Sequence, residues 1–539
     1  YFSLFTSHCS LFLFRSTWAR WRPEAFAYFL LLTQKRILAE TTMPININPH
    51  LLQALRKHPV LRALHQLAQA SHCAVYLVGG AVRDLLRGIS PEKDFDVVTA
   101  ENPKHLARLF SRSVSGTFVP LSEVPPNYRV VAHCQEQRIE VDFAAFRGKT
   151  LTEDLLLRDF SINAISLSLA DLFDTEEPIL LDPTGGIADL QAGVLRVTSV
   201  RSFDDDPLRV LRAVRIARMC HLSLHQDTMS EIVTKQKRLK GIAIERIRSE
   251  FFKAIEGPDA PTTMTLLEKL GILDTVMPLP FTTPFKPEAS LQRRTMNNYD
   301  TIRQCEWLLN HLDCFCPEFA DDIKTYCTGE IEADVHRFGL IKVAGLLHDQ
   351  AFRLRLGSTN SSYRDAGSAM EPLSTLSTHF SVCFKLGKKA SRSLQVMADQ
   401  QKRLNYLFNS KNLSNRMCFR YFYDAGPEGI EAILFFLASI FRGDTSSGNQ
   451  TIDQNVQKSA QRLLYYYYAE YCIVHPQPLI SGQDIMEEFG LSEGKSIGKF
   501  LDRVGQLEAE GRLSTRDEAL AWIRSTLDTS GELRVKSEE

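Results

Sequence analysis

The chain has 539 residues, which is too long for one hydrophobic core, so we expect several domains. Hydrophobic residues make up 44% of the sequence and charged residues 24%, as in ordinary soluble globular proteins, and the net charge is −1. This balance excludes a chain that is basic throughout, so a surface for nucleic acid would have to be local. The eleven cysteines form no CxxC pair, which favours reduced thiols in the cytoplasm over a disulfide framework or a zinc site.

Residues 1–42 differ from the rest of the chain because they are rich in Phe, Trp and Leu. The longest apolar stretch of this segment, Ala25 to Leu32, is too short to cross a bilayer, so we expect no membrane partner. We interpret residues 1–42 as a non-native or disordered extension with Met43 as the true start. A signal or anchor segment is the alternative.

The most informative stretch begins with a short β-branched run that ends in Gly79 and Gly80, with Arg83 in the helical turn that follows. A second apolar run then holds Asp94 and Asp96. Because strand side chains alternate between faces, we expect both carboxylates on the same face. A Gly-Gly turn with free N–H groups, a guanidinium and paired carboxylates suit a triphosphate and its metal ions. An isolated Asp-x-Asp pattern would also fit a solvated edge strand.

Helical spacing precedes this stretch, from residue 45 to residue 70, and two strand-like runs follow it at 127–133 and 138–146. In the second run Arg138, Glu140 and Asp142 share one face. If that strand lies beside the first, Glu140 or Asp142 is a candidate third metal ligand; a polar outer face is the alternative. Alternating strands and short helices, followed by a long helical remainder, predict an α+β head on an α-helical body.

After a turn-rich boundary at 181–186, the pattern is helical from about residue 190. Asp206 stands before Pro207, which predicts a helix with proline in its first turn. Arg209 and Arg212 begin a basic stripe on this helix. An acceptor at Asp206 and a forked donor at Arg209 are what recognition of a base edge requires, although a plain surface stripe would look the same.

Further helices are expected at 244–256, 262–271, 300–312, 338–348, 385–408, 428–441 and 455–473, and in a final unit at 481–526. The Ser/Thr-rich segment 357–378 and residues 445–450 are interpreted as loops. His348 and Asp349 are adjacent and could ligate a metal, but His336 and His379 are poor partners for them. We therefore interpret this pair as structural.

Five motifs now stand in a recognisable order. They are Leu77-Val-Gly-Gly-Ala-Val-Arg-Asp, Asp94-Phe-Asp, Arg158-Asp-Phe-Ser-Ile-Asn-Ala, Asp182-Pro-Thr-Gly-Gly-Ile-Ala-Asp-Leu and Asp205-Asp-Pro-Leu-Arg-Val-Leu-Arg-Ala-Val-Arg. Together they resemble the class II tRNA nucleotidyltransferase and bacterial poly(A) polymerase family. The resemblance covers about residues 70 to 275 and resumes in the final unit, from residue 478.

The resemblance implies an α+β fold, with a polymerase-β-like nucleotidyltransferase head followed by an all-α neck, body and tail. We expect the head at 43–190, a neck with base-recognition and RNA-binding helices at 191–275, a body resembling a degenerate HD domain at 276–440, and a tRNA-binding tail at 441–539. Asp94 and Asp96 would be catalytic and bind Mg²⁺. The implied nucleotide-binding residues are Gly79, Gly80, Arg83, Arg158, Asp206, Arg209 and Arg212, with Asp206 and Arg209 reading the base of CTP or ATP.

Three positions depart from the family pattern. The residue before Arg158 is commonly arginine and is Leu157 here. The residue before Asp206 is commonly glutamate and is the shorter Asp205. In the body, the place of an earlier HD-type histidine falls near residues 297–299, which hold none, so we expect no phosphohydrolase activity.

The leading functional hypothesis is addition of CCA, or part of it, to the 3′ end of tRNA from CTP and ATP. Poly(A) polymerases of the family are the main alternative. They typically carry a Gly-Arg-Arg-Phe-like stretch and a very basic C-terminus, whereas this chain has Ser115-Gly-Thr-Phe and a C-terminus of mixed charge. An inactive RNA-binding scaffold is a remote third hypothesis, which the intact Asp94 and Asp96 disfavour.

Overall fold

The computed structural model divides the chain into two compact units, Tyr1–Arg209 with Cys220–Lys235, and Val210–Met219 with Gln236–Glu539. It describes residues 42–43, 47–100, 102–134, 137–277, 299–358, 370–410, 412–440, 453–471, 479–492, 494–509 and 512–530. The predicted extension therefore lies outside the described residues except for Thr42, which starts strand β1 (Thr42–Met43). None of the described helices combines the length and hydropathy needed to cross a membrane.

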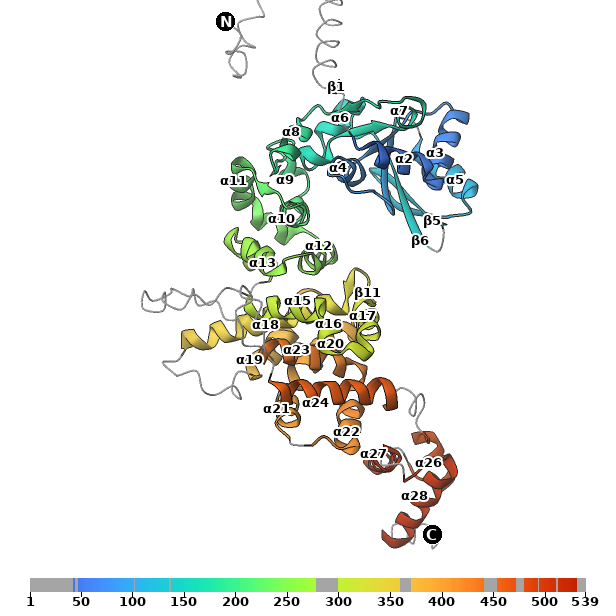
Figure 1. Ribbon diagram of the computed structural model, residues 1–539, viewed down its shortest axis with the longest axis vertical. Helices are drawn as coiled ribbons and strands as arrows, with labels where there is room; N and C mark the ends of the chain where they lie inside the picture. The colour runs from blue at the N-terminus through green and yellow to red at the C-terminus, as the bar shows by residue number, and fades with distance from the viewer. Residues whose placement is uncertain are drawn as a thin grey trace, which may run out of the picture. The chain divides into compact units, whose positions relative to one another are not determined.

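The first unit is built on an eight-stranded mixed sheet in the order β1-β8-β7-β2-β3-β6-β5-β4 (Figure 1). Its strands are β2 (Val75–Val78), β3 (Asp94–Thr99), β4 (Thr117–Glu123), β5 (Pro126–Cys134), β6 (Gln137–Ala145), β7 (Ser166–Ser168) and β8 (Leu180–Leu181). The helices among them are α2 (Pro49–Lys57), α3 (Pro59–Ala70), α4 (Gly80–Leu86), α5 (Pro103–Ser113), α6 (Leu151–Leu156), η3 (Ser161–Asn163) and α7 (Leu169–Asp174). The predicted strands at 127–133 and 138–146 are confirmed as β5 and β6.

One face of this sheet is closed by a large apolar core. Phe95 and Val97 of β3 pack there with Val141 and Phe143 of β6. Helices α2, α3 and α5 supply the covering side chains and lie together on this side of the sheet in Figure 1. The helical segment predicted over residues 45–70 is two helices, because Pro59 cannot donate a backbone hydrogen bond and starts α3 instead.

The other face carries a smaller apolar cluster. It contains Val78 and Val98 from the strands, and Leu155 of α6 and Ala164 cover it. Asp94 and Asp96 point to this face at the start of β3, and both are exposed. One face of the sheet is therefore fully packed. The other face is covered near the end of β3, where Val98 packs, and exposes Asp94 and Asp96 near the start of β3.

The rest of the first unit is α8 (Gly186–Gln191), β9 (Val194–Leu195), α9 (Ser202–Asp205), the start of α10 (Arg209–Met219), β10 (Ser223–Leu224) and α11 (Gln226–Lys235). β9 and β10 pair in parallel, so the neck, which was predicted to be helical, contains one short strand pair. Helix α10 begins at Arg209, two residues after Pro207. Asp206 accepts from the backbone N of Leu208 at 3.2 Å and caps this turn.

The second unit is helical, apart from the β11–β12 hairpin (Glu330–Glu332, Val335–His336). Up to that hairpin it contains η4 (Gln236–Gly241), α12 (Ile244–Glu256), α13 (Ala260–Lys269), α14 (Ile272–Val276), α15 (Asp300–Asn310), α16 (Leu312–Phe315), η6 (Pro317–Phe319) and α17 (Ala320–Thr328). After it come α18 (Arg337–Ser358), α19 (Met370–Cys383), α20 (Lys388–Asp399), α21 (Gln401–Phe408), α22 (Asn415–Ala425), η8 (Gly426–Glu428), α23 (Gly429–Ile440), α24 (Gln454–Tyr465) and the π-helical η9 (Tyr466–Tyr471). The tail helices are α26 (Gly482–Phe489), α27 (Lys495–Ala509) and α28 (Arg516–Ser530).

The α+β prediction, a mixed-sheet head before a mostly helical remainder, is confirmed by this architecture. The loop predicted at 357–378 is wrong from Met370 onward, where α19 runs, because Leu373, Leu376 and Phe380 are buried and repay helix formation. Residues 359–369 of that loop, and the loop predicted at 445–450, lie outside the described residues.

Candidate active site

The Gly-Gly turn presses against one of the predicted metal ligands. Gly79 has φ +72, a conformation that side chains disfavour, and a Cβ atom there would lie 2.8 Å from Oδ2 of Asp96. This contact follows from the antiparallel pairing of β2 with β3, in which Val78 stands opposite Asp96. Glycine at this position thus lets the backbone turn immediately beside the carboxylate.

Strand β6 lies parallel to β3, which confirms the expected neighbourhood. Glu140 pairs in register with Asp94, and Asp142 with Asp96. Both carboxylates are engaged by Arg129 of β5, which donates Nε to Asp142 at 2.7 Å and also ion-pairs with Glu140. The hydrogen bonds to Asp142 raise the pKa of Arg129. Arg138 also ion-pairs with Glu140, so two arginines balance the charges of these two carboxylates.

Two exposed carboxylates on one strand face are hard oxygen donors of the kind that Mg²⁺ prefers. In the described part of the chain, no three His, Cys, Asp or Glu side chains converge as a ready-made metal site. Asp94 and Asp96 therefore fit a metal whose remaining ligands are phosphate oxygens and water, which is how Mg²⁺ is commonly held beside a nucleotide.

Arg83 is buried at 5% exposure and does not face solvent. Its guanidinium forms two hydrogen bonds to Asp84, at 3.0 and 2.8 Å, and a third to Oδ1 of Asn163 at 3.0 Å. Burial alone would lower the pKa of Arg83, but the hydrogen bonding to Asp84, together with the Coulombic effects of Cys220, Asp84 and Asp159, outweighs it and raises the pKa. Arg83 thus joins helix α4 to the segment that contains Asn163.

That segment is organised by carboxylates. Asp154 is fully buried and accepts both Nε and Nη2 of Arg158, at 3.0 and 2.9 Å. Asp159 accepts from Nδ2 of Asn163 at 3.2 Å. The chain of contacts from Arg83 through Asn163 to Asp159 brings the first and third sequence motifs together, as the prediction of one site requires.

Arg209 joins the same segment from the start of α10. Its Nη1 donates to Oγ of Ser202 at 2.9 Å, and its Nη2 to the carbonyl of Leu157 at 3.2 Å. Arg212 belongs to the second unit, where it faces Glu250 at 3.9 Å. The structure therefore brings Arg83, Arg158 and Arg209 around one segment, while Arg212, three residues along α10 from Arg209, pairs with Glu250.

Comparison with known proteins decides the family. Residues 75–196 match the model of the poly A polymerase head domain, and residues 221–282 match a probable RNA and SrmB-binding site of polymerase A. The CC-adding tRNA nucleotidyltransferase of Geobacter sulfurreducens is 27% identical over 90% of this chain and 100% of its own length. The chain thus carries the head domain and the adjoining RNA-binding region of the class II tRNA nucleotidyltransferase and poly(A) polymerase family. It is an enzyme of the nucleotidyltransferase class.

Other relatives carry different names. The A-adding tRNA nucleotidyltransferase of Deinococcus radiodurans is 27% identical over 83% of this chain and 94% of its own length. A CCA-adding enzyme of Coxiella burnetii is 38% identical over 39% of this chain and 55% of its own length. Among solved structures, an apo CCA-adding enzyme aligns with a TM-score of 0.55 and 20% identity, covering 90% of this chain and 98% of the other. That likeness supports the nucleotidyltransferase fold.

Sequence reasoning missed three residues that contact the predicted site residues or the segment around them: Arg129, Arg147 and Asp154. Arg129 and Asp154 act through partners that only the strand register and the packing of α6 reveal. Arg147 follows the predicted strand 138–146 directly, and its Nη1 donates to the carbonyl of Leu157 at 3.4 Å. An arginine directly after a strand that carries candidate site residues is a weak indication of a role in the same site, and this indication is present in the sequence.

In the body of this nucleotidyltransferase, the His348 and Asp349 pair has a visible structural partner. Asp349 accepts from the backbone N of Thr301 at 3.1 Å and from its hydroxyl, and Nδ1 of His348 lies 3.1 Å from the same hydroxyl. The pair thereby holds the first turn of α15. Asn297 and Asn298, near the place of an earlier HD histidine, lie outside the described residues.

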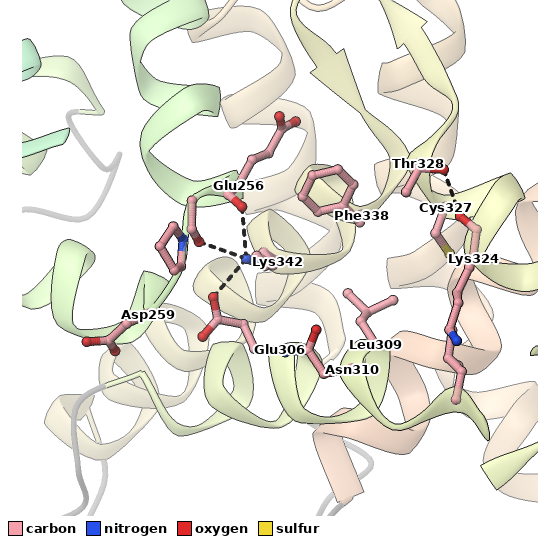
Figure 2. A pocket seen from close by; sticks show the side chains of 13 residues that line it. Glu256, Asp259, Glu306, Leu309, Asn310, Lys324, Cys327, Thr328, Phe338 and Lys342 are labelled. Atoms are coloured by element: carbon pink, nitrogen blue, oxygen red, sulfur yellow. Dashed lines mark hydrogen bonds and ion pairs between the residues drawn. The ribbon is translucent and has the colours of Figure 1, made fainter. Parts of the chain in front are cut away.

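A cavity of about 370 Å³ in the second unit is lined by α12 and the turn that follows it and by α15, α16, α17 and α18 (Figure 2). Lys342 at its wall is 5% exposed and donates to Glu306 at 2.8 Å and to the carbonyls of Glu256 and Gly257. All three ammonium protons are therefore used within the protein. The cavity contains none of the predicted site residues.

Proposed function

We propose that this chain is a template-independent tRNA nucleotidyltransferase that adds CMP, AMP or both to the 3′ end of tRNA from CTP and ATP, releasing pyrophosphate. The observation that carries the proposal is the exposed pair Asp94 and Asp96 on one face of β3, with Gly79 turned against Asp96. The named relatives add CC, A or CCA, which is why tRNA is the acceptor we propose.

Each predicted residue has a part in this mechanism. Asp94 and Asp96 hold a divalent metal, for which we propose Mg²⁺ and which would neutralise the triphosphate and activate the attacking 3′-hydroxyl. The turn at Gly79 and Gly80 brings backbone close to the phosphates. Arg83 and Arg158 act mainly by fixing the segment around Asn163, because their guanidiniums are already bound to Asp84 and Asp154. Asp206 and Arg209 read the base edge from protein rather than from a template strand.

Arg212 enters the proposal only through the family resemblance, since it lies in the second unit beside Glu250. Glu140 and Asp142 are less suitable metal ligands than Asp94 and Asp96, because they are committed to Arg129. We further propose that the enzyme acts in the cytoplasm, where the cysteines of the described segments, which are free thiols, would stay reduced.

The test is primer extension with tRNA that lacks its 3′ end, supplied with Mg²⁺ and with CTP and ATP separately and together. Incorporation of one to three nucleotides on tRNA supports the proposal and shows which part of CCA is made. Long A tails on unrelated RNA would instead favour the poly(A) polymerase alternative. Absence of any incorporation would refute the enzymatic assignment.

A further inference from the structure

The guanidinium of Arg209, the proposed base-reading residue, shares one carbonyl acceptor with a second guanidinium. Nη2 of Arg209 and Nη1 of Arg147 both donate to the carbonyl oxygen of Leu157, at 3.2 and 3.4 Å. The two cationic groups are therefore neighbours, although their residues come from α10 and from the end of β6. Like charges this close repel each other unless an anion or an acceptor-rich ligand joins them.

The carboxylates nearby do not balance this pair. The other arginines around the segment are each matched by a carboxylate: Arg83 by Asp84, Arg158 by Asp154, and Arg196 by Asp189. Among the residues that the structure describes, no carboxylate lies within ion-pair distance of Arg147 or Arg209. Arg147 as a whole residue is exposed, yet desolvation of its guanidinium, aided by Arg158 and Arg209, lowers its pKa.

Arg147 also keeps unused donors. A guanidinium carries five N–H groups, and the only hydrogen bond that the described residues give this one is the long bond to Leu157. Arg209, by contrast, donates to four oxygens, on Ser202, Arg158 and Leu157. Arg209 is thus held in place by the protein, whereas Arg147 is free to bind an incoming molecule.

We propose that Arg147 is a further nucleotide-binding residue, which contacts the base of the incoming nucleotide beside Arg209. This rests on the proposed function. Arg147 lies five residues beyond Asp142, the register partner of Asp96, and is therefore up to about 17 Å along the strand direction from Asp96. A nucleotide whose phosphates meet those carboxylates would present its base to this end.

The chemistry favours cytosine. Its Watson–Crick edge carries two adjacent acceptors, N3 and O2, whereas adenine has one acceptor, N1, beside a C–H group. Two neighbouring guanidiniums can donate to both acceptors of cytosine, whereas adenine offers an acceptor to only one of them. Loss of Arg147 should therefore weaken CTP more than ATP.

The experiment measures equilibrium binding of CTP and of ATP to the full chain with Mg²⁺ and without RNA. Arg147→Ala should weaken CTP binding about tenfold or more, with a smaller effect on ATP, as expected for one charge-assisted hydrogen bond. Arg147→Lys should recover part of the loss. Arg62→Ala is the matched control, because Arg62 is also exposed and donates to a single carbonyl, that of Arg56, at 3.3 Å.

Unchanged affinity of Arg147→Ala for both nucleotides would overturn the inference, and an equal loss for CTP and ATP would overturn the assignment to the base. The backbone N of Arg147 donates to Asp154 at 3.1 Å, and because the substitutions leave the backbone unchanged, we expect them to keep this bond and the local fold. Nucleotide binding is measured without tRNA and does not depend on primer extension. Failure of primer extension by the wild type would therefore reject the proposed function, and the CTP and ATP affinities would still test the role of Arg147.

Discussion

The contact between Gly79 and Asp96 yields the sharpest test of the site. Gly79→Ala places a Cβ at φ +72 and 2.8 Å from Oδ2 of Asp96, a separation that real Cβ atoms essentially never show. The backbone strain alone costs about 1–3 kcal/mol. The carboxylate must also move by several tenths of an ångström, away from the position in which it would bind metal.

Gly88→Ala separates these two effects. Gly88 has φ +79, so alanine there is strained in the same sense, but no atom lies within 4 Å of its Cβ position. Both variants should lose a similar amount of stability, about 1–2 kcal/mol in urea unfolding. Only Gly79→Ala should also lose activity, by up to about a hundredfold in primer extension, which is the cost of misplacing a catalytic group by about 1 Å.

Additional Mg²⁺ should recover part of the activity of Gly79→Ala if the displaced carboxylate binds metal more weakly. The measurement is the rate of nucleotide incorporation against Mg²⁺ concentration for the wild type and both variants. Equal activity of Gly79→Ala and Gly88→Ala would refute the claim that the glycine protects the position of Asp96. A stability loss confined to Gly79→Ala would show that the two glycines are not matched, and Gly193→Ala, at φ +67 with open space, would replace the control.

Three further predictions concern the metal pair, a buried acid and the tail. Asp94→Ala and Asp96→Ala should each abolish incorporation while tRNA binding in a filter assay stays within about twofold; turnover in either would remove the metal assignment. Glu431 is fully buried, and desolvation raises its pKa to about 7 despite its pairing with Arg337. Glu431 therefore contributes fully to stability below its ordinary pKa of 4.5, and about 3 kcal/mol of this contribution is lost as the pH rises through 7. The free energy of unfolding in urea should decline over this window for the wild type relative to Glu431→Gln. A difference between the two proteins that stays constant with pH would contradict this. Gly505→Leu should loosen the tail and lower Tm, because a Cβ there lies 2.7 Å from Phe419 of α22, whereas Gly498→Leu on the same helix meets open space and should change Tm little; equal Tm values would contradict the packing.

The sequence predicted what depends on local periodicity. The common face of Asp94 and Asp96, the two strands after 126 and most helices follow from side-chain alternation and apolar spacing. It could not predict that Arg83 turns inward to Asn163, since that contact joins residues 80 positions apart. The break at Pro59 was readable, because a proline within a helical pattern ends the helix before it, but the apolar stripe continues across it and the break was overlooked. The helix from Met370 could not be predicted from a Ser/Thr-rich stretch.

The four carboxylates on β3 and β6 show why register matters more than residue type. Asp94, Asp96, Glu140 and Asp142 stand in pairs on adjacent parallel strands and look equivalent in the sequence. Arg129 reaches only the β6 pair with charge-assisted bonds, and a metal would have to break these bonds to use Glu140 or Asp142. The same arginine lowers the repulsion that four clustered negative charges would otherwise exert on a triphosphate. If Asp94 and Asp96 hold the metal as proposed, Arg129 favours β3 over β6 for it and reduces the repulsion that an anionic substrate would meet.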